Sequence, residues 1–198
     1  MKILGDKRSG NCYKVQLVCA LLGLSYEWVS IDILAGETTK EGFLSRNPAG
    51  KIPLLELDDG RFLSESNAII NYLAAASPLV PTGAFEAAKV QQWQFFEQYS
   101  HEPYIAVARF IAKYLGMPQD RLEEYKAKQA GGYRALTVVE EQLGLTSFLV
   151  GETITTADIS LYAYTHVAHE GGFDLTDYPR IREWIRRIES TPGYVPLG

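Results

Sequence analysis

Two adjacent polar residues, Glu65 and Ser66, stand where a helix is predicted to begin. The Ser66 hydroxyl and the unpaired N–H groups of the first turn can receive a carboxylate, because helix N-termini bind anions. Glu65 supplies an acceptor for an ammonium group. A carboxylate and an ammonium side by side describe an amino acid, so the pair is a candidate binding site for one. The alternative is that Ser66 only caps the helix.

Ser9 and Cys12 have the spacing of a C-x-x-C redox motif. Dithiol exchange needs a thiolate in the first position, where this chain has serine, so that chemistry is lost. Cys12 lies in the first turn of a predicted helix, where the pKa of a thiol can drop and a mixed disulfide can form. The alternative is a small core residue that faces the sheet. Cys19 follows on the same helix, about 10 Å away, which excludes a disulfide between the two cysteines.

Two further segments contain residues that could bind a ligand or a metal ion. Ile52-Pro53 begins a predicted strand, a usual place for proline, and Lys51 precedes it. His166 and His169 with Glu170 lack the H-E-x-x-H pattern and an evident third ligand, so we predict a packed or surface role and no metal site.

The elements that must position these residues alternate strands and helices up to residue 76. Apolar and β-branched residues predict strands at 2–5, 26–31, 52–57 and 61–63. Helical spacing predicts helices at 11–22 and 67–76, with a short helical piece near Phe43. The order is therefore βαβαββα, which begins with a βαβ unit.

A segment with two prolines and a glycine, residues 78–83, is the best linker in the chain. All predicted elements beyond it are helices, at 86–115, 121–143, 156–169 and 178–189. Pro103 predicts a kink in the first of them, and Gly131-Gly132 weakens the prediction of the second at its middle. Thr155 and Asp158 form a capping box at the start of the third, so Asp158 is expected to be a folding element.

Four motifs resemble the cytosolic glutathione S-transferases of the serine type, bacterial-like members related to the theta and nu classes. They are, in chain order, Ser9-Gly10-Asn11-Cys12, the segment from Asn47 to Pro53, Glu65-Ser66, and the segment from Thr155 to Asp158. The resemblance implies an α/β thioredoxin-like N-terminal domain at 1–76, a linker at 77–85 and an all-α helical bundle at 86–198.

The resemblance also implies that a glutathione thiolate attacks a small hydrophobic electrophile, with Ser9 as stabiliser of the thiolate and Asn11 as a second donor. The pKa of a free thiol is about 8.5, and lowering it by about two units takes roughly 2.7 kcal/mol. A hydroxyl donor and a helix N-terminus can supply this energy. An ordinary helix cap is the alternative role for Ser9.

The remaining site residues follow from the same resemblance. A cis peptide at Ile52-Pro53 is expected to turn the Ile52 backbone toward the cysteinyl backbone of the ligand, while Lys51 neutralises the glycyl carboxylate. The full set implied for glutathione binding is Cys12, Thr38, Lys51, Ile52, Pro53, Glu65 and Ser66. Ser100, Tyr104 and Arg109 are candidates for the electrophile pocket. Glutathione is expected as a co-substrate with no other cofactor, and the chain as a homodimer.

Composition excludes several classes of protein. The 198 residues are 46% hydrophobic and 22% charged with a net charge of −5, which fits a folded acidic protein and argues against a nucleic-acid partner. The lack of an apolar span, of a signal peptide and of a disulfide predicts a cytoplasmic protein. Five residues follow Gly193, too few for a further helix, so an open substrate cleft is expected. Glutathione-dependent reduction of disulfides or peroxides, and a non-catalytic binding module, remain alternatives; the Ser-Ser-Cys signature of the isomerase branch is not matched.

Overall fold

Two units make up the chain in the computed structural model, which describes residues 1–198. Unit 1 comprises residues 1–77 together with 191–198, and unit 2 comprises residues 78–190. The division after residue 77 lies one residue from the predicted end of the first domain. The last eight residues, however, pack within unit 1 and not with the helical domain to which they were assigned.

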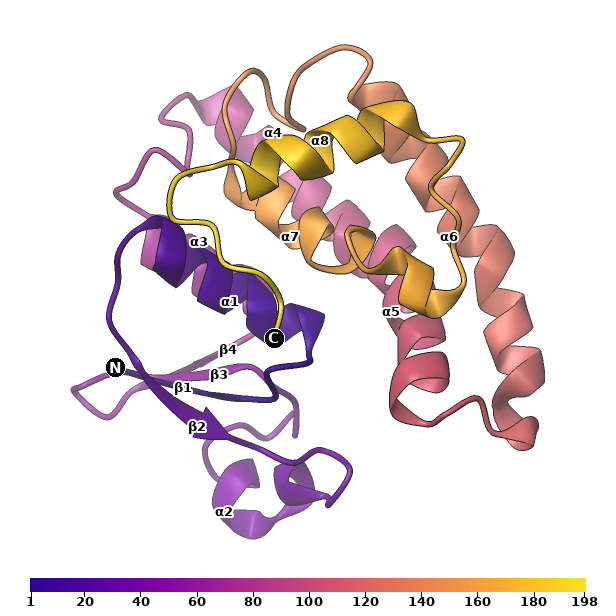
Figure 1. Ribbon diagram of the computed structural model, residues 1–198. Coiled ribbons are helices and arrows are strands. Elements are labelled where there is room, and N and C mark those ends of the chain that lie inside the picture. The colour runs from indigo at the N-terminus through magenta and orange to yellow at the C-terminus, as the bar shows by residue number, and fades with distance from the viewer. The chain divides into compact units, whose positions relative to one another are not determined.

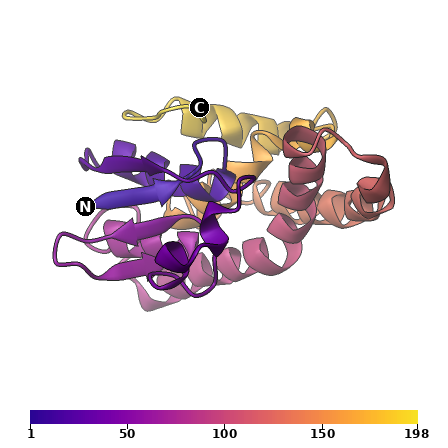
Figure 2. The same cartoon turned by 90° about the horizontal axis from the view of Figure 1, so that it is seen from below.

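The sheet of unit 1 has four strands in the order β2-β1-β3-β4, which lie side by side in Figure 2. β1 (Lys2–Gly5) pairs in parallel with β2 (Glu27–Ser30). β3 (Leu54–Glu56) runs antiparallel to β1, and β4 (Phe62–Ser64) runs antiparallel to β3. The four predicted strands are therefore present: β1 has the predicted bounds, β2 and β3 are shorter than predicted, and β4 is shifted by one residue.

Helices cover both faces of this sheet. α1 (Gly10–Leu21) and α3 (Ser66–Ala74) pack against each other on one face, and α2 (Glu41–Leu44) lies on the other side (Figure 1). The predicted stop of the first helix is confirmed, because Gly23 has a φ of 63° and Leu24 N donates to Cys19 O at 2.8 Å.

The first helical stretch of unit 2 is interrupted twice. α4 (Ala84–Phe96) continues through a π-helical segment (Glu97–His101) into α5 (Glu102–Arg109), and a second π-helical segment (Phe110–Tyr114) follows. The interruption that was expected as a kink at Pro103 is the first π-helical segment. Pro103, which has no N–H to donate, lies in the first turn of α5 directly after it.

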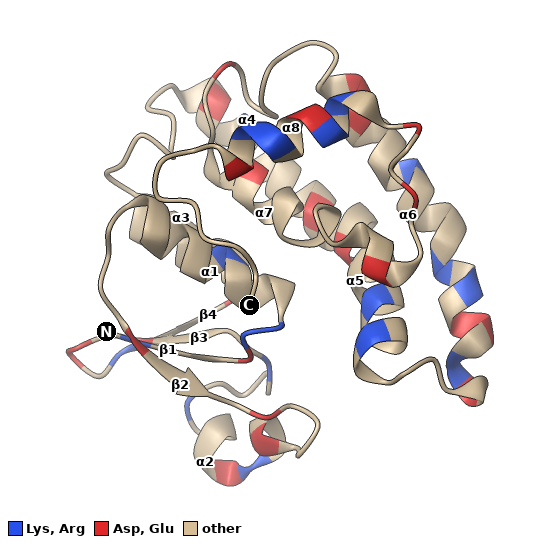
Figure 3. Cartoon of the chain, viewed as in Figure 1, with Lys and Arg blue, Asp and Glu red and all other residues tan.

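The other helices of unit 2 are α6 (Leu122–Gln142), α7 (Thr156–Thr165) and α8 (Pro179–Glu189). The capping box at the start of α7 is confirmed, and Asp158 also accepts from Leu149 N at 2.8 Å and Trp184 Nε1 at 2.9 Å. α7 ends four residues before the predicted end at 169 and a 3₁₀ turn covers residues 168–171. Residues of both charge signs occur along α6 and α8 (Figure 3).

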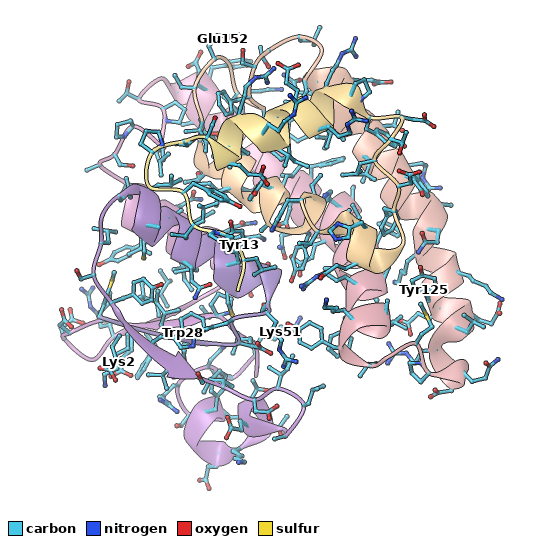
Figure 4. The ribbon with its side chains drawn as sticks, in the orientation of Figure 1. Lys2, Tyr13, Trp28, Lys51, Tyr125 and Glu152 are labelled. Atoms are coloured by element: carbon cyan, nitrogen blue, oxygen red, sulfur yellow. The ribbon has the colours of Figure 1, made fainter.

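The C-terminal segment, residues 191–198, lies along α1 (Figure 1). The hydroxyl of Tyr13, labelled in Figure 4, donates to Val195 O at 2.7 Å, and a Cβ on Gly193 would lie 3.0 Å from Ala20 O. This contact explains why the segment belongs to unit 1.

Among the helices of both units, none combines the length and the apolar character that a membrane span requires.

Candidate functional site

Three segments that carry predicted site residues meet at one end of the sheet in unit 1. Leu54, at the start of β3, is paired with Leu4 near the end of β1 and with Ser64 at the end of β4. The loops that leave β1, enter β3 and leave β4 therefore begin or end side by side. These loops contain Ser9, Ile52-Pro53 and Glu65 respectively.

Ser9 is the N-cap residue of α1, with an extended backbone and a partly exposed side chain. Its Oγ accepts a hydrogen bond from Cys12 N at 3.4 Å, as expected of a capping serine. The hydroxyl proton can still be donated to another acceptor. A thiolate placed there would also lie at the positive end of the α1 dipole. The capping role and the proposed chemical role are thus compatible.

Cys12 is packed in the core of unit 1 and has no exposed surface. A Cβ on Gly5 would lie 2.5 Å from the Cys12 sulfur, so the thiol fills the space above the end of β1. Burial raises the pKa of Cys12 to about 12, although the Ser9 hydroxyl acts in the opposite direction. The thiol is therefore neutral near pH 7. This placement favours the core interpretation of Cys12 and argues against its expected contact with glutathione.

Cys19 has a similar environment. It is buried and free, and desolvation raises its pKa to about 12. Cys12 and Cys19 are both free thiols on α1.

The loop before β3 presents an unpaired backbone. The Ile52–Pro53 peptide bond is cis, as the resemblance implies. The Ile52 N–H and C=O have no hydrogen-bond partner in the chain, so they are available to the backbone of a peptide ligand. Lys51 is exposed on the same loop (Figure 4). The buried Asn47 side chain holds the loop, because its Nδ2 donates to Lys51 O at 2.7 Å.

The segment between β4 and α3 combines backbone strain with a helix N-terminus. Glu65 has a φ of 69°, which is unusual for a residue with a side chain, and its side chain is exposed. Ser66 begins α3, and its own N–H has no partner in the chain. Its Oγ donates to Asn11 Oδ1 at 3.2 Å. This bond brings the first turns of α1 and α3 together, so the predicted residues Ser9, Asn11 and Ser66 belong to one region.

Thr38, the remaining predicted residue of this set, lies in a 3₁₀ turn (Glu37–Thr39) and is mostly buried. A Cβ on Gly50 would lie 3.3 Å from Thr38 O, which places the turn against the loop before β3. A cavity of about 310 Å³ opens beside this end of the sheet, between residues 5–8 and 30–32. Asp6 and Arg8, which line it, form an ion pair at 2.8 Å.

A second cavity, of about 210 Å³, lies in unit 2 between the helical stretch from α4 to α5 and α6. Ser100 and Tyr104 line it, together with Phe96, Gly131 and Arg134.

Arg109 does not line that cavity. Its side chain is 4% exposed, and its Nε donates to Glu170 Oε2 at 2.6 Å. Lys113 Nζ is 2.8 Å from the other oxygen of Glu170. Burial alone would raise the pKa of Glu170, but the bonds from Lys113 and Arg109 outweigh it and lower this pKa. Arg109 is therefore part of a structural ion pair, because a buried guanidinium needs a partner.

His166 also has a structural environment. Its ring stacks on Tyr162 at 4.4 Å between centroids, and Nδ1 lies 2.8 Å from Tyr162 O. Burial lowers the pKa of His166 to about 4. No group of three or more His, Cys, Asp or Glu side chains is placed to hold a metal ion.

Sequence reasoning missed two residues of this region. Asn47 holds the Lys51 carbonyl, and the turn signal of Asn47-Pro48 was available for it. Lys14 is fully buried on α1 and donates from Nζ to Ser66 Oγ at 3.3 Å. The sequence could have indicated Lys14, because it lies next to Val15 in a mostly apolar helical segment, and a lysine buried in such a segment usually has a partner.

Comparison with known proteins agrees with the motifs. Residues 4–81 match the model of the glutathione S-transferase N-terminal domain, and residues 97–192 match that of the C-terminal domain. Glutathione S-transferase F13 of Arabidopsis thaliana is 30% identical over 100% of this chain and 94% of its own length.

Solved structures extend the comparison. A glutathione S-transferase from Pseudomonas fluorescens Pf-5 is 59% identical with a TM-score of 0.97, over 99% of this chain and 98% of that one. A maleylacetoacetate isomerase from Methylobacterium extorquens AM1, solved with bound malonate and GSH, is 26% identical with a TM-score of 0.82, over 98% of this chain and 94% of that one. The chain belongs to the glutathione S-transferase family.

Proposed function

We propose that this protein binds glutathione in unit 1 and transfers its thiolate to small hydrophobic electrophiles. The observation that carries the proposal is the meeting, at one end of the sheet, of a hydroxyl at a helix N-terminus, an unpaired strand-like backbone at Ile52 and the N-terminus of α3. These groups match the thiol, the peptide backbone and the α-carboxylate of glutathione in turn.

In this function the glutathione thiol releases its proton to solvent, and the Ser9 hydroxyl stabilises the resulting thiolate by donating a hydrogen bond to the sulfur. The thiolate sulfur then forms a bond to a carbon of the electrophile. In a substitution the leaving group departs with its electron pair; in an addition the π electrons of the double bond shift away from the attacked carbon and the product takes up a proton from solvent. The reactive sulfur comes from the substrate, because the Cys12 thiol is buried and neutral. Ile52 and Ser66 offer backbone groups, and Glu65 and Lys51 pair with the ammonium and the glycyl carboxylate.

The cavity lined by Ser100 and Tyr104 is the proposed place for an aromatic second substrate, since its walls combine the rings of Phe96 and Tyr104 with polar groups such as Ser100 that can orient a ligand. A homodimer and a cytoplasmic location are part of the same proposal, as is the use of glutathione as co-substrate without another cofactor.

Ser9→Ala and Ser9→Thr test the role of the hydroxyl. Removing one hydrogen bond to an anion should raise the pKa of the bound glutathione thiol by about 1 to 2 units in Ser9→Ala. The conjugation rate with an aryl halide should fall about tenfold or more at pH 6.5 and recover at high pH. Ser9→Thr keeps the hydroxyl and should keep the wild-type pH profile.

Cys12→Ala is the matched control and should retain activity. Loss of activity in Cys12→Ala with full activity in Ser9→Ala would reverse the two roles. Disulfide and peroxide reduction are measured in parallel, and faster reduction than conjugation would favour the reductase alternative. If the wild-type protein does not retain glutathione at millimolar concentration, it is a binding module for some other ligand.

A further inference from the structure

Lys14 is a fully buried lysine in the middle of the glutathione-binding region of unit 1. It lies on α1 between Tyr13 and Val15, and all three side chains have no exposed surface. Lysine is almost never buried to this degree unless it has a partner. Its Nζ donates to Ser66 Oγ at 3.3 Å, so the lysine side chain crosses from α1 to the first residue of α3.

The Ser66 hydroxyl is held from two sides. It accepts from Lys14 Nζ and donates its single proton to Asn11 Oδ1 at 3.2 Å. In this arrangement the hydroxyl has no second proton for a ligand. An arriving carboxylate is therefore received by the Ser66 N–H and by the positive end of α3. The hydroxyl instead fixes where the helix begins.

We propose that Lys14 is a positioning residue for the α-carboxylate of glutathione, acting through Ser66. It fixes the start of α3 and supplies a positive charge one hydroxyl group away from the carboxylate. Attraction between opposite charges is stronger there than in water, because Lys14 has no exposed surface. The inference rests on the proposed function and extends it to a preference for γ-glutamyl compounds with a free α-carboxylate.

Lys14→Met tests this role, since methionine keeps the length of the apolar stem and removes the charge. Binding is measured by calorimetry with two ligands: glutathione, and 4-aminobutyryl-cysteinylglycine, which lacks only the α-carboxylate. Lys14→Met should bind glutathione about tenfold to a hundredfold more weakly than the wild type does. Its affinity for the analogue should change by less than about threefold. Lys14→Arg keeps the charge and should retain most of the preference for glutathione.

Lys126→Met is the matched control on the exposed surface of α6 and should bind both ligands as the wild type does. An equal loss of affinity for both ligands in Lys14→Met means a general structural role and overturns the inference. Unchanged glutathione binding in Lys14→Met overturns it as well. If the wild type binds neither ligand, the proposed function itself fails.

If Lys14→Met does not fold, the wild-type protein labelled with ¹³C-lysine replaces it, with Lys14→Arg used to assign the resonance. The Lys14 ¹³Cε signal should move when glutathione is added and stay in place when the analogue is added. Equal movement with both ligands would overturn the inference.

Discussion

Glu65 presents its carboxylate from a backbone conformation that favours glycine. Its φ is 69° and its ψ is 112°, while its side chain is exposed. Such a conformation costs on the order of 1–3 kcal/mol in a residue with a Cβ and is concentrated at ligand sites. The side chain is therefore explained better by what its carboxylate binds than by stability.

Glu65→Gly and Glu65→Ala separate these two properties. Both variants lose the carboxylate, so both should bind glutathione about tenfold more weakly or worse. Only glycine relieves the positive φ, so Glu65→Gly should be more stable than Glu65→Ala by about 1 kcal/mol in urea unfolding. Equal stability of the two variants would contradict the strain, and unchanged affinity would remove Glu65 from the site.

The polar residues of the site differ in how far the sequence predicts them. The positions of Ser9 and Ser66 at the starts of two helices were predictable, because each precedes a helical pattern. Lys14 was not, because the sequence shows a lysine among apolar residues but not the hydroxyl on α3 that holds it. The ion pair of Arg109 was not predictable for the same reason: helical spacing alone does not show that Glu170 is its partner.

At the scale of elements, α6 depends on two glycines that would weaken an isolated helix. A Cβ on Gly131 would overlap the ring of Tyr104, and a Cβ on Gly132 would overlap the ring of Phe173. Phe173 is 1% exposed, so it has little room to move. The glycines that lowered the predicted helicity are therefore the positions where aromatic rings approach the α6 backbone.

Gly132→Ala should destabilise the protein although alanine is the better helix former. The overlap with Phe173 should cost about 1–3 kcal/mol, more than the gain of about 1 kcal/mol in helix propensity. Gly42→Ala in α2 is the matched control, because a Cβ there meets nothing within 4 Å, and it should stabilise slightly. Urea unfolding of both variants measures the difference. A more stable Gly132→Ala would show that Phe173 moves freely.

Element types were predictable in this chain, but some element details were not. The capping box gave the start of α7 because its two side chains bond within one turn. Pro103 predicted an interruption of the first helical stretch, but nothing in the sequence predicted that it is π-helical or that a second π-helical segment follows. In the first π-helical segment Glu97 and His101 are both fully buried, and His101 Nε2 lies 2.9 Å from Thr165 Oγ1 on α7. A contact between residues this far apart in the sequence leaves no local pattern from which a π-helical turn could be predicted.

At the scale of the whole molecule, the chain leaves unit 1 at residue 77 and returns to it at residue 191. The first crossing was predictable, because prolines and a glycine mark it. The return was not: the last eight residues carry no periodic pattern, and their place depends on a tyrosine of α1 that donates to a backbone carbonyl. A backbone acceptor leaves no trace in the amino-acid sequence.

Acid stability of the whole chain should depend on His166. Burial lowers its pKa from 6.5 to about 4, so the unfolded chain binds a proton there at a pH where the folded chain does not. The contribution of the neutral His166 to the free energy of unfolding is therefore fully present above about pH 6.5 and is lost as the pH falls toward 4. This contribution to the free energy of unfolding is about 3 kcal/mol, because the pKa of His166 is lowered by about 2.5.

His166→Phe keeps a ring that can stack on Tyr162 and removes the titrating group. In urea unfolding between pH 7 and pH 4, the wild type should lose about 3 kcal/mol more stability than this variant, because only the wild type must exclude a proton from a buried imidazole. His169→Gln alters an exposed histidine three residues away and should lose stability as the wild type does. Parallel pH curves for the wild type and His166→Phe would show that His166 takes up its proton equally well in the folded and unfolded chain.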